Sequence, residues 1–286
     1  MSHRAPWIAF VNSLAYAEHD PEAPLVVEAL REAGARADLH AWNATVDWTG
    51  YDLVVVRSPW DYFDHLDRFL RWVDEVAAAT RIVNPASVIR WNSHKGYLTE
   101  MGERGVPVLP TILLAGGTTH AAERLADCGW ADVVVKPAVD GGARQTLRAD
   151  PCSGEAAAHV ERLVAGGDVV VQPYAPQIEA GETSLLFFGG AFSHAVRKVP
   201  AKGDYRVQAH HGGTEQPHAP SAAELETARR AMGCAPGPLT YARVDLIDVD
   251  GAPTLMELEV IEPDLFLRLA DRALGRFADA VLAELR

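Results

Sequence analysis

The stretch from Tyr241 to Pro263 constrains this chain most, because it predicts a β-hairpin with four charged residues on one face. Side chains two positions apart in a strand point to the same side of the sheet. Arg243 and Asp245 therefore share a face of the first strand, and Glu257 and Glu259 share a face of the second. The apolar residues between them take the opposite face.

The length of the turn decides whether these two sets meet. Asp250 and Gly251 form a strong turn signal between the strands. A three-residue loop that includes Ala252 places Asp245 opposite Glu257, and it brings the arginine opposite the second glutamate. A two-residue loop shifts the pairing by one residue and sends the two sets to opposite faces. A shared site on this hairpin therefore requires the longer loop.

Three carboxylates on one face repel one another unless a cation neutralises them. Hard oxygen ligands of this kind suit Mg²⁺, which takes one or two carboxylates together with phosphate oxygens. A solvated face of an acidic protein is the alternative interpretation. The succession of Arg-x-Asp and Glu-x-Glu favours a magnesium site formed by Asp245, Glu257 and Glu259.

The composition limits the partners of the chain. Its 286 residues, of which 48% are apolar, predict two or three subdomains with sizeable cores. The 39 acidic and 26 basic residues give a net charge of −13, which argues against nucleic acid or an anionic membrane as a partner. No apolar run is long enough to span a membrane, and polar residues follow the N-terminus too soon for a secretory signal. The three cysteines are isolated, without a C-x-x-C motif, so we expect a cytoplasmic protein with neither disulfides nor zinc.

The first part of the chain alternates short apolar runs with amphipathic stretches. We expect strands at residues 7–11, 37–42, 52–58 and 81–85, and helices at residues 22–33 and 66–79. This order predicts a small, mostly parallel sheet with covering helices. Ligands of such sheets usually bind beyond the carboxyl ends of the strands. Arg57, Ser58 and Trp60 lie at such an end and are candidates for substrate contact, with a plain strand-to-helix loop as the alternative.

The pattern changes along the rest of the chain. We expect helices at residues 92–105, 119–126 and 155–165, and strands at residues 108–114, 132–138 and 169–174. Consecutive strands follow at residues 184–188, 192–198 and 204–211 before the hairpin, with helices at residues 222–232 and 266–285.

Lys136 lies at the end of an apolar strand, so the base of its side chain should be buried. A buried ammonium group is costly unless an anion accompanies it. Gly141 and Gly142 allow backbone amides to approach a ligand closely, and Arg144 adds a positive charge. These residues predict a phosphate cradle, although the P-loop motif is absent. Lys95 taken alone is typical of a surface lysine on a helix.

The order of these segments is more specific than any one of them. It runs from Lys95 through VVVKPAVDGGAR, VQPY, AGETSLLFF and RVD to MELEVIEP. In this order the chain resembles the ATP-grasp superfamily from about residue 84 to the C-terminus, with the N-terminal α/β unit also in place. The phrases VNPASVIRWNSHK, YARVDL and MELEVIEPDLFLR look most like the small ATP-grasp ligases that include the D-cycloserine-forming (O-ureido-serine) cyclo-ligase. Glutathione synthetase and D-alanine–D-alanine ligase are more distant in appearance.

The resemblance implies a fold of α/β and α+β class. It consists of a parallel α/β domain at residues 1–85, a central ATP-grasp lobe with a mobile loop at residues 86–174, and a C-terminal lobe with the metal site at residues 175–286. ATP is expected between the two lobes.

The resemblance also implies a nucleotide site, whose residues are carried over by position. The candidates are Lys95 and Lys136 at the phosphates, Gly141, Gly142 and Arg144 in the mobile loop, Gln172, Pro173, Tyr174 and Ala175 at the adenine hinge, and Glu182, or Glu179 as second choice, at the ribose. Gln172 departs from the acidic residue often found at the hinge.

Metal binding and catalysis are implied in the same way. Asp245, Glu257 and Glu259 would bind Mg²⁺, and Arg243 would stabilise charge on the transferred phosphoryl group. Glu259 stands where D-alanine–D-alanine ligases often have asparagine, but either side chain offers an oxygen.

The basic segment at residues 197–213 is unusual in this acidic chain. Its functional interpretation is recognition of the acceptor carboxylate and the γ-phosphate by Arg197, Lys198 and especially Arg206. A solvated hairpin edge is the alternative.

These features together predict an ATP-dependent ligase that forms a C–N bond through an acyl phosphate. Such chemistry requires positioning, Mg²⁺ and cationic donors, and no covalent nucleophile of the enzyme. The expected substrate is small and amino-acid-like, and the sequence leaves a homodimer open. The alternatives are an intermolecular peptide-type ligase of the glutathione-synthetase kind and a non-catalytic ATP-binding regulatory module.

Overall fold

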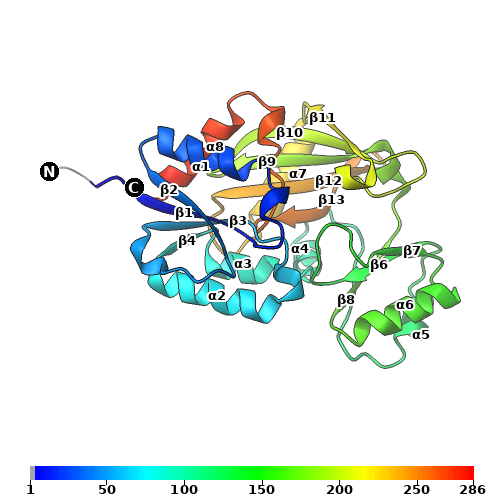
Figure 1. The fold of residues 1–286 in the computed structure, drawn as a ribbon. Helices are drawn as coiled ribbons and strands as arrows, with labels where there is room; N and C mark the ends of the chain where they lie inside the picture. The colour runs from blue at the N-terminus through cyan, green and yellow to red at the C-terminus, as the bar shows by residue number, and fades with distance from the viewer. Residues whose placement is uncertain (1–3) are drawn as a thin grey trace.

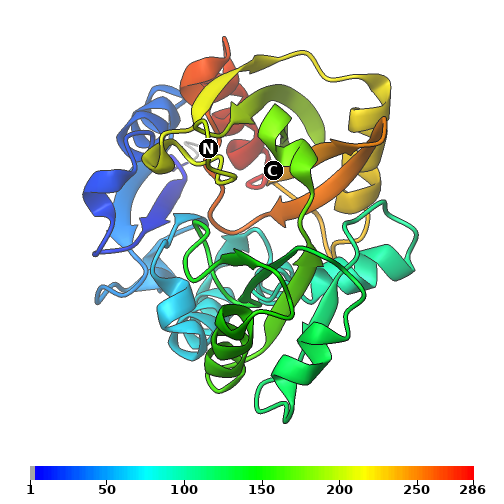
Figure 2. The same ribbon diagram turned by 90° about the vertical axis from the view of Figure 1, so that its right-hand side faces the viewer.

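The computed structural model describes residues 4–286, and three β-sheets organise this part of the chain (Figure 1). The N-terminal sheet has the strand order β2-β1-β3-β4, the central sheet β5-β8-β6-β7, and the C-terminal sheet β11-β10-β9-β12-β13. Figure 2 shows the central lobe below the C-terminal sheet. Among the described residues, no helix is both long and apolar enough to cross a membrane.

The N-terminal sheet is parallel throughout, which confirms the expected α/β unit. Its strands are β1 (Trp7–Asn12), β2 (Arg36–Ala41), β3 (Leu53–Ser58) and β4 (Arg81–Val83). Helix α1 (Ala23–Glu32) and the C-terminal helix α8 (Ala273–Ala283) pack on one face, and helix α2 (Leu66–Ala79) packs on the other. Every residue of β3 is buried, as expected for a parallel strand that is covered on both faces.

The central sheet is antiparallel. Its strands are β5 (Ile112–Leu114), β6 (Val133–Pro137), β7 (Leu147–Ala149) and β8 (Val169–Pro173). Helices α5 (Ala121–Ala126) and α6 (Gly154–Val164) share one apolar core with it. The short strand β7, which the sequence does not predict, leaves residues 139–145 as the connection between β6 and β7.

The C-terminal sheet is also antiparallel and carries the charged hairpin. Its strands are β9 (Glu182–Phe188), β10 (Ala191–Val199), β11 (Thr214–His218), β12 (Tyr241–Val249) and β13 (Ala252–Glu259). Helices α3 (Ala86–Asn92), α4 (Tyr97–Glu103) and α7 (Ala222–Met232) share a core with one face, and α8 packs on the other. Helices α3 and α4, although inside the expected central lobe, therefore pack on the C-terminal sheet.

The hairpin has the expected facing pairs but not the expected loop. Arg243 lies opposite Glu259, and Asp245 lies opposite Glu257. The three-residue loop is nevertheless wrong, because the last strand pair leaves a two-residue turn at Asp250-Gly251, where both residues have positive φ. A β-bulge beside Asp245 leaves one residue of β13 unpaired, and this extra residue restores the register that the short turn would have shifted.

Three other expected elements are wrong. The predicted helix over residues 92–105 breaks around Lys95, which lies in a turn between α3 and α4. The predicted strand over residues 204–211 is absent, because the Asp204 carboxylate accepts the next two backbone N–H groups and so forms a turn. The predicted terminal helix begins at Ala273 and not at Phe266, since Phe266 and Arg272 both have positive φ.

Short 3-10 helices complete the described chain. They are η1 (Ala17–His19), η2 (Trp48–Gly50), η3 (Tyr62–Asp64), η4 (Pro176–Ala180), η5 (Ala209–His211) and η6 (Leu267–Leu269).

Candidate active site

The charged face of the hairpin is a network of ion pairs. Arg243 donates from Nε to Asp245 at 3.0 and 3.1 Å and from Nη2 at 2.9 Å. The same Nη2 pairs with Glu259. Ser184, on the neighbouring strand β9, donates its hydroxyl to Asp245 at 2.5 Å. Strands β9, β12 and β13 thus bring the predicted catalytic arginine and two predicted metal ligands into direct contact.

Two lysines from other elements pair with carboxylates on this face or beside it. Lys95 Nζ lies 2.8 Å from Glu257, and it also donates to the backbone oxygen of Asp140 at 2.6 Å. Lys198 on β10 pairs with Glu182 and lies 3.5 Å from Asp245. The turn between α3 and α4 therefore positions Lys95 between the acidic face and the loop after β6.

Two glutamates of the site hold their protons more tightly than exposed glutamates do. Burial raises the pKa of Glu259 to about 8, against the opposing effect of Arg243. Burial likewise raises the pKa of Glu262 to about 7. Asp245 is different: burial acts to raise its pKa, but Arg243 and Lys198 outweigh burial and hold it below the usual value. A divalent cation bound beside Glu259 and Glu262 would favour the ionised form of both carboxyl groups.

The three carboxylates suit a hard divalent cation, but their oxygens do not converge on one point. Asp245, Glu257 and Glu259 supply carboxylate oxygens from facing positions of one hairpin, the ligand type that Mg²⁺ prefers. In residues 4–286, no group of three His, Cys, Asp or Glu side chains is close enough to hold a metal ion. Arg243 and Lys95 occupy part of the carboxylate oxygens instead.

Lys136 has the properties expected of an anion-binding lysine. It lies on β6, half-buried, and burial lowers its pKa. Within the described residues no carboxylate lies within ion-pairing distance of it, unlike Lys95 and Lys198. Because a buried ammonium group without a counter-ion is unfavourable, this lysine is suited to bind a phosphate oxygen.

The glycine loop at residues 139–145 lies against the N-terminal domain. Gly142 has a φ of +65°, which favours glycine. A Cβ atom on Gly141 would lie 2.9 Å from the ring of Phe63, so the loop backbone approaches that ring closely. Arg144 forms two hydrogen bonds to Asp64, at 3.0 and 2.7 Å.

The predicted adenine hinge follows β8. The Gln172 side chain is buried and donates to the Thr111 hydroxyl at 3.0 Å, so its amide is engaged within the protein. Tyr174 donates its hydroxyl to Glu179 at 2.9 Å, and the guanidinium of Arg148 lies 3.4 Å from the centre of its ring. Pro173 ends the strand, and Ala175 precedes the 3-10 helix η4. Glu179, second choice for the ribose, lies nearer this hinge in sequence than Glu182, whose carboxylate is paired with Lys198.

The predicted substrate residues are not gathered at one surface. Arg57 is 1% exposed, pairs with Glu22 at 3.2 Å and donates to the backbone oxygen of Pro263. Trp60 donates its indole N–H to the backbone oxygen of Glu262 at 3.0 Å. Both side chains therefore tie the N-terminal domain to the segment after β13, and this placement argues against direct substrate contact by Arg57.

The remaining predicted residues have other partners. Ser58 is fully buried, with a hydroxyl that has no hydrogen-bond partner among the described residues. Arg197 donates to the backbone oxygen of Ala180 at 3.1 and 2.7 Å. Arg206 pairs with Asp204 at 2.7 Å and remains partly exposed. Lys198 is buried and committed to carboxylates of the protein.

Several residues of the site were missed in the sequence. Glu262 accepts a hydrogen bond from the Tyr62 hydroxyl at 3.1 Å, at the junction of the N-terminal domain and β13. Its place in MELEVIEP, three residues after Glu259, could have indicated that it lies near the acidic face. No local pattern in the sequence indicates Phe63 or Asp64, because Asp64 and its partner Arg144 in the glycine loop are 80 positions apart.

Comparisons with known proteins agree with this architecture. The profile of the D-cycloserine synthetase DcsG N-terminal domain matches residues 8–84, and the profile of the prokaryotic glutathione synthetase ATP-grasp domain matches residues 113–270. The cycloserine biosynthesis protein DcsG of Streptomyces lavendulae is 34% identical over 299 residues, which cover 98% of this chain and 99% of that protein. A glutathione synthetase of Ralstonia nicotianae is 27% identical over 85% of this chain and 76% of its own length.

Solved structures show the same relationship. The crystal structure of D-cycloserine synthetase DcsG superposes with a TM-score of 0.89 at 31% identity, over 98% of this chain and all of that one. D-alanine–D-alanine ligase from Bacillus anthracis has a TM-score of 0.71 at 14% identity over 99% of this chain and 97% of its own, which shows a shared fold alone. This chain therefore belongs to the ATP-grasp ligases, in the group that includes DcsG, and it is an ATP-dependent enzyme that forms carbon–nitrogen bonds.

Proposed function

We propose that this enzyme is a cyclo-ligase, which activates the carboxylate of a small amino-acid-like substrate with ATP and joins it to a nitrogen of the same molecule. The observation that carries the proposal is the match to DcsG across both parts of the chain, including the N-terminal domain at residues 8–84. A shared ATP-grasp half alone would support only the activation step. The N-terminal domain, which contacts Glu262 through Trp60 and Tyr62, supports a similar acceptor.

The chemistry follows from the residues of the site. A carboxylate oxygen of the substrate attacks the γ-phosphorus of ATP, ADP leaves, and an acyl phosphate forms. The substrate nitrogen then attacks the carbonyl carbon, loses its proton and expels phosphate. Arg243, held in place by Asp245 and Glu259, supplies positive charge where negative charge develops. Lys136 and Lys95 would bind phosphate oxygens, and the glycine loop would exclude water that could hydrolyse the intermediate.

Magnesium fits the carboxylates of Asp245, Glu257 and Glu259, and when bound it supplies charge neutralisation between the phosphates. Binding at Glu257 requires Lys95 to exchange part of its ion pair with this glutamate for contact with phosphate.

Intermolecular ligation is the second candidate. The match of residues 113–270 to the glutathione synthetase ATP-grasp domain favours it, because that domain contains most of the activation machinery. The two candidates differ in the number of amino-acid partners. A cyclo-ligase needs one, and an intermolecular ligase needs two. A regulatory module without turnover loses its support, because the chain belongs to a ligase family and retains Arg243 beside the acidic face.

Steady-state release of ADP tests the proposal. The protein is supplied with ATP, Mg²⁺ and either O-ureido-serine of each handedness, D-alanine, or γ-glutamylcysteine with glycine, and products are identified by mass spectrometry. We expect ADP and a cyclic product in equal amounts from one O-ureido-serine enantiomer alone. ADP release that needs two amino-acid partners would refute cyclisation and favour the intermolecular ligase.

A further inference from the structure

Arg144 of the glycine loop is directed at the N-terminal domain. Its Nη1 and Nη2 donate to the two oxygens of Asp64 at 3.0 and 2.7 Å. Its Nε lies 3.5 Å from the carboxylate of Asp140. Each nitrogen of this guanidinium thus faces a carboxylate, an arrangement that differs from the phosphate contact expected from the sequence.

The ring of Phe63 supports the same loop at two points. The guanidinium carbon of Arg144 lies 4.5 Å from the ring centre, a stacking that guanidinium groups favour. At Gly141 a side chain would come within 2.9 Å of the same ring, so the loop backbone rests directly on it. Phe63 and Asp64 together therefore form a continuous seat for the loop.

The seat belongs to a segment that also reaches the C-terminal lobe. Within residues 59–65, the Trp60 indole N–H and the Tyr62 hydroxyl both contact Glu262, at 3.0 and 3.1 Å. The next two residues of the same segment are Phe63 and Asp64. One short segment of the N-terminal domain thus touches both the end of the hairpin and the glycine loop.

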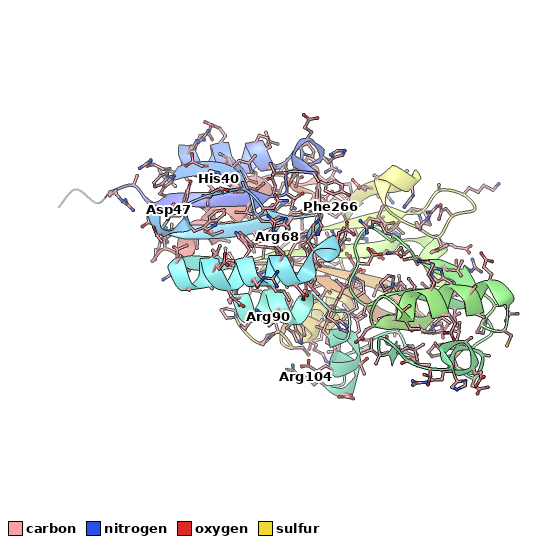
Figure 3. The ribbon with its side chains drawn as sticks, turned by 60° about the horizontal axis from the view of Figure 1, so that its bottom comes forward. His40, Asp47, Arg68, Arg90, Arg104 and Phe266 are labelled. Atoms are coloured by element: carbon pink, nitrogen blue, oxygen red, sulfur yellow. The ribbon has the colours of Figure 1, made fainter. Side chains whose placement is uncertain are left out.

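An exposed ion pair by itself contributes little, and the side chains of Arg144 and Asp64 are 38% and 46% exposed. Two features distinguish this pair from an ordinary one. The fork-to-fork geometry restricts the guanidinium to one orientation, and the stacked ring shields one of its faces. The pair Arg90–Asp74 provides a comparison, since its hydrogen bonds have similar lengths of 2.8 and 2.7 Å. Both come from Nη2 of Arg90, and the pair joins α3 to α2 away from the loop. Arg90 is labelled beside these helices in Figure 3.

We propose that Phe63 and Asp64 are the docking seat of the glycine loop and that Arg144 is a positioning residue that latches the loop onto the N-terminal domain. This inference rests on the proposed ligation, in which the loop covers the phosphates. Closure of the loop then depends on the N-terminal domain, which also contacts Glu262 of the candidate site through Trp60 and Tyr62. Loss of the latch leaves Lys95 and Lys136 of the nucleotide site in place but opens the acyl phosphate to water.

A double-mutant cycle measured by hydrogen exchange tests the latch. Asp64→Asn, Arg144→Gln and their combination are compared with the wild type in the presence of a non-hydrolysable ATP analogue and Mg²⁺, with Asp74→Asn as the matched control. Because an exposed charged pair is worth at most about 1 kcal/mol, we expect amides of residues 139–145 to exchange about fivefold faster in each single variant. The double variant should exchange no faster than Arg144→Gln alone, since that change already removes the pair with Asp64. Phe63→Leu should produce a similar acceleration with the ion pair retained.

A second measurement, the ratio of ADP released to product formed, reports the leak of the intermediate. The ratio should rise above one in Asp64→Asn and stay at one in Asp74→Asn. The latch is overturned if Asp64→Asn exchanges like the control while Arg144→Gln alone raises the KM for ATP, because Arg144 would then bind phosphate independently of Asp64. Hydrogen exchange needs no turnover, so the absence of product from every amino acid tried would count against the proposed function and leave the test of the latch in force.

Discussion

Replacing Glu257 with glutamine should separate the catalytic role of the acidic face from its structural role. The Glu257 side chain is 30% exposed and has one ionic partner, Lys95, which keeps a second hydrogen bond to the backbone of Asp140. Asp245 is the contrasting case. It is 4% exposed and is held by Arg243, Lys198 and Ser184.

Replacing Asp245 should therefore destabilise the protein much more than replacing Glu257. Losing one partly exposed pair at Glu257 costs about 1 kcal/mol, which lowers the unfolding temperature of a chain of this size by about 2 °C. Asp245→Asn removes the counter-charge of a buried arginine and lysine, a change that costs about 3–5 kcal/mol, or about 6–10 °C. Turnover should fall by about 10²–10³ or more in both variants, because each removes a proposed ligand of the metal that neutralises the phosphates.

Thermal unfolding without nucleotide or Mg²⁺ measures the loss of stability in each variant. ADP release across a Mg²⁺ titration measures the loss of turnover. A Glu257→Gln enzyme that keeps more than a tenth of wild-type turnover at saturating Mg²⁺ would refute the assignment of Glu257 as a ligand. Equal losses of unfolding temperature in the two variants would refute the comparison of their ion pairs.

Three further predictions concern other charged residues. Arg206→Ala should lower kcat by about 10²–10³ with little change in unfolding temperature, because its pair with Asp204 is partly exposed; unchanged kcat with both substrates saturating would remove Arg206 from the site. Arg57→Ala should cost about 3–5 kcal/mol in urea unfolding, because it leaves the buried Glu22 without its partner; an effect confined to the KM of the amino-acid substrate would restore the substrate-contact interpretation. Burial raises the pKa of Asp140 from 3.8 to about 6, so the folded state holds a proton that the unfolded chain releases, and this contribution to stability is lost as pH rises through about 6. The stability of Asp140→Asn relative to wild type should therefore increase between pH 4 and pH 7, and a difference independent of pH would contradict the burial argument.

The parts of the fold that follow from local periodicity were predictable. The two-residue period of a strand placed Arg243, Asp245, Glu257 and Glu259 on one face, and the structure pairs them as expected. The apolar runs of the first domain predicted a parallel sheet, which is observed. The strand predicted at residues 204–211 failed because a single carboxylate, Asp204, competes for the backbone N–H groups that a strand would use.

The choice of ionic partners was much less predictable than the choice of faces. Arg57 lies at the carboxyl end of β3, where a ligand contact is a reasonable expectation, but Glu22 and Pro263 take its donors. Lys198 was expected to contact the substrate because it lies in a basic segment, but it is buried and paired with Glu182. Such pairings depend on tertiary contacts between distant segments, and the residue order of one chain does not encode them in any local pattern.

The bulge opposite Asp245 leaves one residue of β13 out of the strand pairing, between the turn and the acidic face. A two-residue turn shifts the strands by one position, and the unpaired Met256 of β13 shifts them back before Glu257. Deleting the unpaired Met256 would remove the bulge and leave Glu257 opposite Asp245 and Glu259 opposite Arg243. Inserting one more residue between the turn and Glu257 would carry both glutamates to the apolar side unless a second bulge formed. The hairpin should therefore tolerate the loss of one residue from this part of β13 far better than the gain of one, because the bulge holds a residue that the pairing does not use.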